Sequence, residues 1–263
     1  MHPMHPKHAE LTEWLDAALP LHEPVGEILE RAPDLAALDA YRIQQALMDR
    51  HVARGDRIVG YKAALTSKAM QEQSGVGEPL LGTLLASRVF AEDEPVSLSR
   101  FLKASLEPEV AVLLKADLRG PGVTPLDALA AVAGYLPALE LGDYRTGDNP
   151  RSLQQTLVCN TFNGGIVLGG PLSAPAGLDL RTEGMVMTCN GVLRGSATAV
   201  EVLGDPLRSV AFMANKLAEL GGGLRAGMVL MTGSIVRSIP LAPGDAVCVE
   251  FTRLGTVRVR TTG

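Results

Sequence analysis

The chain has 263 residues, a length that fits one large domain or one domain with a smaller appendage. Twenty-four basic residues against 29 acidic ones give a net charge of −5, and aromatic residues make up only 4%. This composition lacks both the basic surface and the stacking platforms with which proteins bind nucleic acids. No apolar run approaches the roughly 20 residues of a membrane span, so we expect no membrane partner either.

The cysteines and the N-terminus favour a cytoplasmic protein. The three cysteines, Cys159, Cys189 and Cys248, are far apart and form neither a zinc pattern nor a disulfide framework. Such cysteines are typical of a reducing compartment. The first eight residues contain no apolar segment of the kind found in signal peptides.

Residues 1–57 are predicted to form a small helical region. Apolar residues at helical spacing predict one helix over 9–19 and a second over about 35–54. Asp34 is the expected N-cap of the second helix, and Gly55 is expected to end it. We expect this region to pack on the rest of the molecule.

From residue 58 onward, short apolar runs separated by Gly and Pro predict a β-rich domain that extends to residue 263. The predicted strands cover 57–65, 80–90, 109–115, 137–143, 164–168, 184–189, 228–235, 246–252 and 256–260. Two helices are predicted between them, over about 124–134 and 205–220, with Thr124 and Asp205 as N-caps. The fold class is therefore α+β.

Three glutamates are the strongest chemical signal. Glu107 and Glu109 precede an apolar run, and residues two apart in a strand point to the same face. At ~6 Å and an effective dielectric near 20, two such charges repel by about 3 kcal/mol unless water, a proton or a cation screens them. Glu140 lies inside another apolar strand, where an isolated carboxylate costs several kcal/mol. Three carboxylates together make an oxygen-only donor set that suits Mg²⁺ or Mn²⁺.

The distribution of histidines restricts the chemistry. All five histidines lie in the first fifth of the chain: His2, His5, His8, His22 and His51. The β-rich domain therefore contains no histidine base and no histidine metal ligand. Proton transfer there must use Lys, Glu, Asp, Tyr or a metal-bound water.

An ordered set of segments resembles a known family. The segments are Gly60-Tyr61-Lys62, Leu65-Thr66-Ser67-Lys68, Gly77-Glu78-Pro79, Glu107-Pro108-Glu109, Pro137-Ala138-Leu139-Glu140, Cys189-Asn190-Gly191, Ala214-Asn215-Lys216-Leu217-Ala218 and Leu230-Met231-Thr232-Gly233-Ser234. In this order they resemble the 2-keto-4-pentenoate hydratase / 2-oxo-3-hexenedioate decarboxylase family of the fumarylacetoacetate hydrolase superfamily. The likeness covers about residues 40 to 260.

The resemblance implies a fold, a metal and site residues. The expected fold is a mixed β-roll or sandwich catalytic domain over 58–263 with the small helical region at 1–57. The implied metal is Mg²⁺ or Mn²⁺, and its ligands are Glu107, Glu109 and Glu140. The implied catalytic residues are Lys62 and Glu78, and the implied substrate-binding residues are Ser67, Thr232 and Ser234.

The resemblance also implies an activity. Family members act late in the meta-cleavage degradation of aromatic compounds and are homo-oligomers. We expect a hydratase that adds water to 2-hydroxypenta-2,4-dienoate or a close analogue and gives a 4-hydroxy-2-oxo acid. Lys62 is expected to shuttle protons with a lowered pKa. An association with a pathway aldolase or decarboxylase is also expected.

Three alternatives stay open. A 4-oxalocrotonate (2-oxo-3-hexenedioate) decarboxylase would need a cation for the distal carboxylate, for which Arg145, Arg151 and Arg194 are candidates. An acylpyruvate-type C–C hydrolase would need a base, usually a histidine, near the metal. An inactive metal-binding paralogue is the third alternative.

One segment departs from the family pattern. Where the family shows Ala-Asp-Asn-Ala-Ser-Ser, this chain has Val158-Cys159-Asn160-Thr161-Phe162-Asn163. The expected Asp is replaced by Cys159, and two small residues are replaced by Phe162 and Asn163. Bulk and polarity at these positions would affect which substrate fits.

Overall fold

A computed structural model describes residues 6–26, 28–92, 94–148 and 152–263. The α-helices are α1 (Pro6–Ala18), α2 (Ile28–Arg31), α3 (Ala37–Ala53), α4 (Lys68–Ser74), α5 (Pro125–Ala131), α6 (Leu153–Val158) and α7 (Pro206–Glu219). The strands are β1 (Ile58–Ala64), β2 (Leu80–Leu85), β3 (Val89–Phe90), β4 (Val96–Ser97), β5 (Ala104–Leu114), β6 (Val132–Asp143), β7 (Asn163–Leu168), β8 (Gly184–Cys189), β9 (Val192–Thr198), β10 (Val229–Ser234), β11 (Ile239–Pro240), β12 (Ala246–Phe251) and β13 (Gly255–Thr262).

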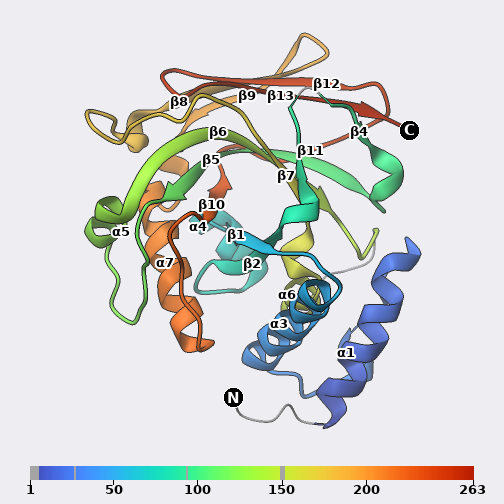
Figure 1. Cartoon of the computed structure of the whole chain (residues 1–263). Helices are drawn as coiled ribbons and strands as arrows, with labels where there is room; N and C mark the ends of the chain where they lie inside the picture. Colours follow the sequence, from blue (N-terminus) through green and yellow to red (C-terminus); the bar gives the residue numbers. More distant parts are fainter. Residues whose placement is uncertain (1–5, 27, 93, 149–151) are drawn as a thin grey trace.

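The strands form two sheets stacked one on the other (Figure 1). The larger sheet has eight strands in the order β2-β1-β10-β5-β6-β7-β3, with β11 also pairing with β5. The smaller sheet has five strands in the order β4-β13-β12-β8-β9. The larger sheet curls, so that β2 at one end of the strand order comes into contact with β7 near the other. The larger sheet is therefore a roll with an inner and an outer face.

The long hairpin of β5 and β6 forms the middle of the larger sheet, and its two faces belong to different cores. Alternate residues such as Leu106, Val110 and Leu139 join the main hydrophobic core, which also contains the inward side chains of the smaller sheet. The intervening positions, including Ala111 and Ala138, belong to a separate small apolar cluster inside the roll. Because successive strand residues point to opposite faces, Glu107 and Glu109 point into the roll as well.

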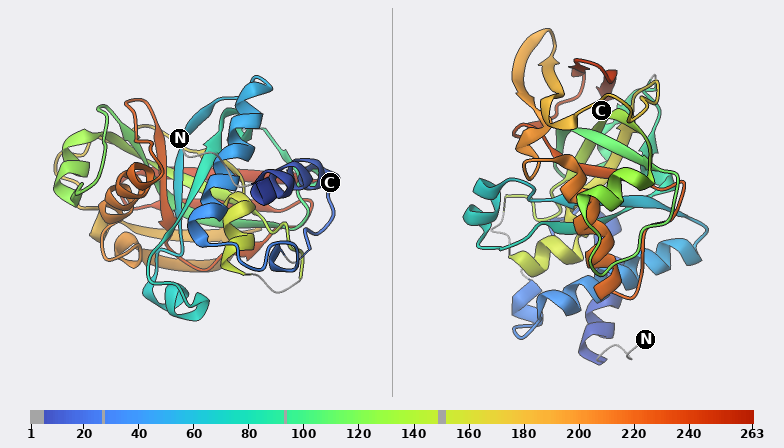
Figure 2. Two further views of the ribbon diagram at one scale, coloured as in Figure 1. Left: turned by 90° about the horizontal axis from the view of Figure 1, so that it is seen from below. Right: turned by 90° about the vertical axis from the view of Figure 1, so that its left-hand side faces the viewer.

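Helices cover the rest of the larger sheet. The amphipathic helix α7 packs against α5, β10 and β1, and Asp205 caps its N-terminus. The N-terminal helices α1 and α3 pack together, and α3 packs on α6 (Figures 1 and 2). Among the described residues, the structure has no helix whose length and apolar character would let it cross a membrane.

The α+β fold with a small helical N-terminal region is as predicted. The division of the chain at residue 57 stays a prediction. Asp34 as N-cap is wrong, because α3 begins at Ala37 and Ala36 is the capping position. Thr124 does cap α5, but this helix ends at Ala131, where β6 begins.

Several short elements were not predicted, namely α2, α4, α6, β4, β9 and β11. Helix α6 has six residues, too few to show a 3.6-residue period. Strand β9 exposes most of its side chains at the edge of the smaller sheet, so it lacks an apolar pattern.

Candidate metal centre and active site

The three predicted metal ligands come together inside the roll. Glu107 and Glu140 are directly opposite each other in the β5–β6 ladder, and Glu109 is two residues further along β5 on the same face. One carboxylate oxygen from each residue lies within 4.8 Å of the other two. The cluster thus follows directly from strand register.

Glu140 has one oxygen occupied by protein donors and one that is not. The Lys62 ammonium donates to Glu140 Oε1 at 2.6 Å, and the Asn163 amide donates to the same oxygen at 2.9 Å. Glu140 Oε2 is buried and has no hydrogen-bond partner. Leaving a buried charged acceptor unpaired costs at least about 1–3 kcal/mol.

Glu109 likewise has one oxygen bound to a protein donor and one oxygen without a partner. The backbone N–H of Gly233 donates to Glu109 Oε2 at 2.7 Å, whereas the buried Oε1 has no partner. Two fully buried carboxylates therefore each keep one unpaired oxygen, next to a third carboxylate. With Glu107, these oxygens form a donor set that fits a hard divalent cation.

The electrostatics of the cluster show how unfavourable three carboxylates are on their own. Burial, and then the charge of Glu140, raise the pKa of Glu107 to about 7. The same two causes raise the pKa of Glu109 well above its ordinary value. Like-charge repulsion and lost hydration both favour the protonated acids, and a dication would relieve both.

Without a metal ion, the pKa of Lys62 is raised, whereas a lowered pKa is expected for Lys62 next to a bound metal. Burial lowers the pKa of Lys62, but the nearby charges of Glu140, Glu107 and Glu109 and the hydrogen bond to Glu140 more than offset that effect. The net pKa is raised, so Lys62 carries a proton inside the roll.

A dry apolar surface adjoins the carboxylates on the same face of the sheet. It consists of the fully buried side chains of Leu84, Ala111, Ala138, Ile166 and Met231. This cluster makes the inside of the roll apolar next to the carboxylates.

The predicted substrate-binding hydroxyls have protein partners. The Thr232 hydroxyl donates to the Val110 carbonyl at 2.8 Å, and the Ser234 hydroxyl donates to the Val236 carbonyl at 2.6 Å. Ser67 is the N-cap of α4 and accepts a hydrogen bond from the Met70 N–H at 3.3 Å. Their contact with substrate stays a prediction.

Glu78, predicted to be catalytic, has its own ion pair outside the carboxylate cluster. Its side chain is 56% exposed, and Oε1 lies 2.8 Å from the ammonium of Lys216 on α7. Lys216 also pairs with Glu219 at 2.7 Å. A catalytic role for Glu78 stays a prediction.

The arginines considered for a distal carboxylate have different positions. Arg145 is buried, and its Nη1 donates to Asp143 Oδ2 at 3.0 Å. Arg194 lies on β9 of the smaller sheet, whereas the glutamates belong to the larger one. Arg151 lies outside the described residues.

Sequence reasoning missed the turn that precedes β7. Asn160, Thr161 and Phe162 have φ of 52°, 50° and 59°, so all three are in the left-handed region. This conformation costs about 1–2 kcal/mol for each L-residue. The Thr161 carbonyl accepts a hydrogen bond from Lys62 Nζ at 3.3 Å. The available signal was the asparagine, a residue type enriched at positive φ.

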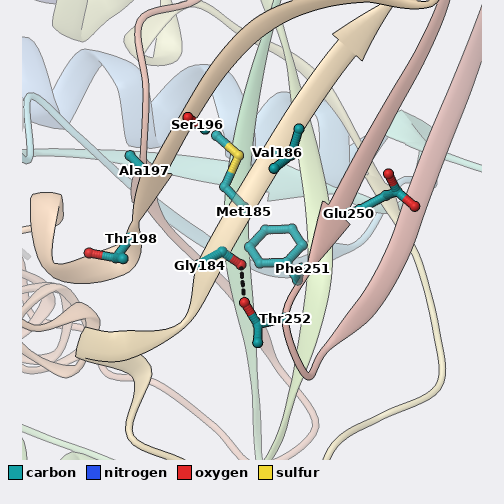
Figure 3. A pocket seen from close by; sticks show the side chains of 9 residues that line it. All are labelled: Gly184, Met185, Val186, Ser196, Ala197, Thr198, Glu250, Phe251 and Thr252. Atoms are coloured by element: carbon teal, nitrogen blue, oxygen red, sulfur yellow. Dashed lines mark hydrogen bonds between the residues drawn. The ribbon is translucent and has the colours of Figure 1, made fainter.

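A hollow on the smaller sheet carries none of the predicted site residues. It is lined by residues of β8, β9 and β12 and contains one carboxylate, Glu250 (Figure 3). One exposed carboxylate among hydroxyl and apolar side chains does not form a catalytic set. The carboxylates inside the roll are therefore a better candidate site than this hollow.

Comparisons with known proteins identify the family of this chain. Residues 48–262 match the model of the fumarylacetoacetate (FAA) hydrolase C-terminal family. The chain is 35% identical to 2-oxo-hept-4-ene-1,7-dioate hydratase of Escherichia coli, covering 96% of this chain and 97% of the relative. It is 36% identical to 4-oxalocrotonate decarboxylase of Pseudomonas putida, and the alignment covers 93% of this chain and 92% of that relative. It is also 36% identical to 2-hydroxypent-2,4-dienoate hydratase of Pseudomonas putida, with 81% and 96% covered.

A solved structure extends the comparison to three dimensions. The 4-oxalocrotonate decarboxylase of Pseudomonas putida G7, complexed with magnesium and adipate, superimposes with a TM-score of 0.94 at 34% identity over 97% of both chains. Together with the oxygen donor set inside the roll, this relative supports a divalent metal. The family model spans most of the chain, and relatives above 30% identity align along nearly their whole length. This chain therefore belongs to the fumarylacetoacetate hydrolase C-terminal family.

Proposed function

We propose that this chain is a divalent-metal-dependent hydro-lyase that adds water to 2-hydroxypenta-2,4-dienoate or a close analogue and gives a 4-hydroxy-2-oxo acid. The observation that carries the proposal is the set of unpaired, buried oxygens of Glu109 and Glu140 beside Glu107, with the Lys62 ammonium in contact with Glu140. Relatives at 32–36% identity named as dienoate or pentenoate hydratases support it.

The metal in this proposal is Mg²⁺ or Mn²⁺, held by Glu107, Glu109 and Glu140. When bound, it supplies a positive charge that stabilises the enolate of a 2-oxo acid without proton transfer. The metal would also neutralise buried carboxylates at this position. The pKa values of Glu107 and Glu109 are raised by burial and by the charge of Glu140, so ionisation is unfavourable there without a cation.

Lys62 is the proposed proton carrier. Ketonisation of the dienol removes a proton from the 2-hydroxyl group and adds one at C5. Water then adds its oxygen at C4, and C3 takes a proton. Lys62 Nζ is the proton donor beside Glu140, 2.6 Å from its Oε1. The apolar side chains of Ala138, Ile166 and Met231 exclude water from the hydrocarbon part of the substrate.

Decarboxylation of 4-oxalocrotonate is the second candidate, because decarboxylases of that name are equally similar to the chain. That reaction needs a group that binds the distal carboxylate. Arg145 is engaged with Asp143 and is buried, and Arg194 belongs to the other sheet. For Arg145 and Arg194, the two candidate arginines that the structure describes, these positions favour the hydratase over the decarboxylase.

One assay separates the candidates. The purified protein is incubated with Mg²⁺ or Mn²⁺ and, separately, with 2-hydroxypenta-2,4-dienoate, 4-oxalocrotonate and an acylpyruvate. Loss of dienoate absorbance without CO₂ supports the hydratase. Release of CO₂ from 4-oxalocrotonate, with the dienoate left unchanged, would show that the protein is a decarboxylase and not a hydratase. Formation of pyruvate from the acylpyruvate would indicate a C–C hydrolase. No turnover of any of the three with metal bound would point to an inactive paralogue.

Several further parts of the proposal rest on the family resemblance. They are roles for Glu78 as a catalytic residue and for Ser67, Thr232 and Ser234 in substrate binding, assembly as a homo-oligomer in the cytoplasm, and association with an aldolase or decarboxylase of the same pathway.

A further inference from the structure

The turn before β7 has an unusual backbone. Three consecutive residues other than glycine, Asn160–Phe162, have positive φ. Elsewhere in the described chain, positive φ at residues other than glycine occurs singly, as at Leu65 and Asn190. A β-branched residue such as Thr161 especially avoids this region. A run of three therefore needs a strong external restraint.

The side chain of Asn160 supplies this restraint. Its Oδ1 accepts from the Thr83 N–H at 2.7 Å, and its Nδ2 donates to the Thr83 carbonyl at 2.9 Å. Strand β2 is at the end of the strand order of the larger sheet. The amide thus continues the backbone hydrogen-bond pattern of β2 where the next strand would pair. It fastens the turn to the edge of the sheet.

The approach of the turn to β2 leaves no room for a side chain at position 82. A Cβ on Gly82 would lie 2.3 Å from Thr161 Oγ1 and 2.9 Å from Lys62 Cγ. Gly82 is also directly opposite Lys62 in the β1–β2 ladder. The fastened turn is therefore packed tightly against the lysine stem.

This turn delivers two groups to the charged centre. The Thr161 carbonyl accepts from Lys62 Nζ at 3.3 Å, and Asn163, which follows the turn, donates to Glu140 Oε1 at 2.9 Å. These two contacts hold the ammonium and one carboxylate oxygen, so that the unpaired Glu140 Oε2 has a fixed direction. Both contacts depend on where the turn lies.

We infer that Asn160 is a positioning residue of the candidate active site. Its amide fastens the left-handed turn to Thr83 and thereby sets the orientation of Lys62 and Glu140. The inference rests on the proposed function in so far as Lys62 transfers protons, and its structural part can be tested without turnover.

Asn160→Gly is the informative variant, because glycine keeps access to positive φ and removes only the amide. We expect kcat for the dienoate to fall about ten- to a hundredfold, the range found when residues that orient metal ligands are replaced. KM should stay within about threefold. The dissociation constant of Mg²⁺ should rise by no more than about tenfold, since Glu107, Glu109 and Glu140 all remain and only the orientation of Glu140 is loosened. Asn160→Asp keeps the acceptor but not the donor, and should recover part of kcat.

Asn190→Gly is a matched control. Asn190 also has positive φ, 53°, and its amide makes two hydrogen bonds, from the Ala246 N–H at 2.9 Å and to Asp245 at 2.8 Å. It lies between β8 and β9, on the other sheet. We expect its kcat to equal that of the wild type. An equal loss of kcat in both glycine variants, or no loss in Asn160→Gly, would overturn the inference.

A readout without substrate completes the test. In ¹⁵N-lysine-labelled protein, the Lys62 ammonium signal should exchange slowly with water in the wild type and in Asn190→Gly, and faster in Asn160→Gly and Asn160→Asp. Equal exchange in all four proteins overturns the inference. Loss of Mg²⁺ binding or of the folded CD spectrum in both Asn160 variants also overturns it in favour of a purely structural role. If the wild type does not hydrate the dienoate, the proposed function fails, but the exchange rates still decide whether Asn160 positions Lys62.

Discussion

Lys62 Nζ lies 2.6 Å from Glu140 Oε1, and the two side chains are 4% and 2% exposed. Their strands, β1 and β6, are not neighbours, because β10 and β5 lie between them in the sheet. The contact exists because the larger sheet curls and its inner face closes on itself (Figure 1). This buried ion pair joins the predicted proton carrier to a predicted metal ligand.

Lys62→Met should both destabilise the metal-free protein and remove activity. Removing one partner of a buried ion pair costs about 3–5 kcal/mol, because the other charge is left without compensation. Urea unfolding in EDTA should show this loss, and Mg²⁺ should recover part of it. Loss of proton transfer should lower kcat by at least about a hundredfold.

Lys103→Met is the control for this variant. Lys103 pairs with Asp148 at the surface and is 47% exposed. An exposed ion pair contributes at most about 1 kcal/mol, so stability and kcat should hardly change. A Lys62→Met protein that kept the kcat of the wild type would rule out Lys62 as the proton carrier.

Glu109→Gln should have opposite effects on stability and on metal binding. Glutamine keeps an oxygen acceptor for the Gly233 N–H and replaces a carboxyl group whose ionisation is opposed by burial and by the charge of Glu140. In EDTA we therefore expect a free energy of unfolding at least as high as that of the wild type. The Mg²⁺ dissociation constant, measured by calorimetry, should rise at least about a hundredfold, beyond the effect usual for residues that only orient ligands.

The metal should also stabilise the wild type by mass action. At a concentration of one hundred times its dissociation constant, Mg²⁺ adds about 2.7 kcal/mol to the free energy of unfolding. Glu250→Gln, on the smaller sheet, should keep this stabilisation, whereas Glu109→Gln should lose it. A Glu109→Gln protein with unchanged metal affinity and turnover would refute the carboxylate site.

Gly233→Ala should destabilise the protein and disturb Glu109. Gly233 has φ of +119°, and a Cβ would lie 2.1 Å from Oγ1 of the buried Thr66. Backbone strain and overpacking each cost about 1–3 kcal/mol, so we expect a total of about 2–6 kcal/mol in thermal or urea unfolding. Metal affinity should fall as well, because the Gly233 N–H holds Glu109 Oε2.

Gly227→Ala separates strain from the clash. Gly227 has φ of +83°, but a Cβ added there would have no heavy atom within 4 Å, so only about 1–2 kcal/mol of backbone strain is expected. Its metal affinity should equal that of the wild type. Equal losses of stability in the two variants would show that the contact with Thr66 is unimportant.

Asp16→Asn tests how α1 is held on α3. The hydrogen bond from Arg54 lowers the pKa of Asp16 to about 2, against a raising effect of burial and with a further lowering by Arg50. A lowered folded-state pKa stabilises the protein above the unfolded value of 3.8, and the stabilisation is lost as the pH falls from there to about 2.

The expected size of this effect is small, because Arg54 is exposed and solvent screens the pair. At pH 7 the free energy of unfolding in urea should fall by at most about 1 kcal/mol in Asp16→Asn. The difference from the wild type should shrink below pH 4 and vanish near pH 2. A difference that does not depend on pH would mean that Asp16 acts through packing or neutral hydrogen bonds.

Local patterns were enough to predict the three clustered carboxylates and most of the elements. Two-residue periodicity places Glu107 and Glu109 on one face, and the apolar context of Glu140 requires a partner for its charge. Neither inference needs to know how the sheet curls. The same holds for Thr124 and Asp205 as N-caps, since capping depends on neighbours in the sequence.

Only the tertiary structure decided which groups surround these carboxylates. Lys62 donates a hydrogen bond to Glu140, and the Gly233 N–H donates one to Glu109. Glu78 instead forms an ion pair with Lys216. These contacts form because strands and helices far apart in sequence meet in the rolled sheet. The raised pKa of Lys62 follows from the same long-range contacts. A sequence pattern indicates on which face of a strand a side chain lies. The charged groups next to that side chain depend on the curl of the sheet, which no local pattern specifies.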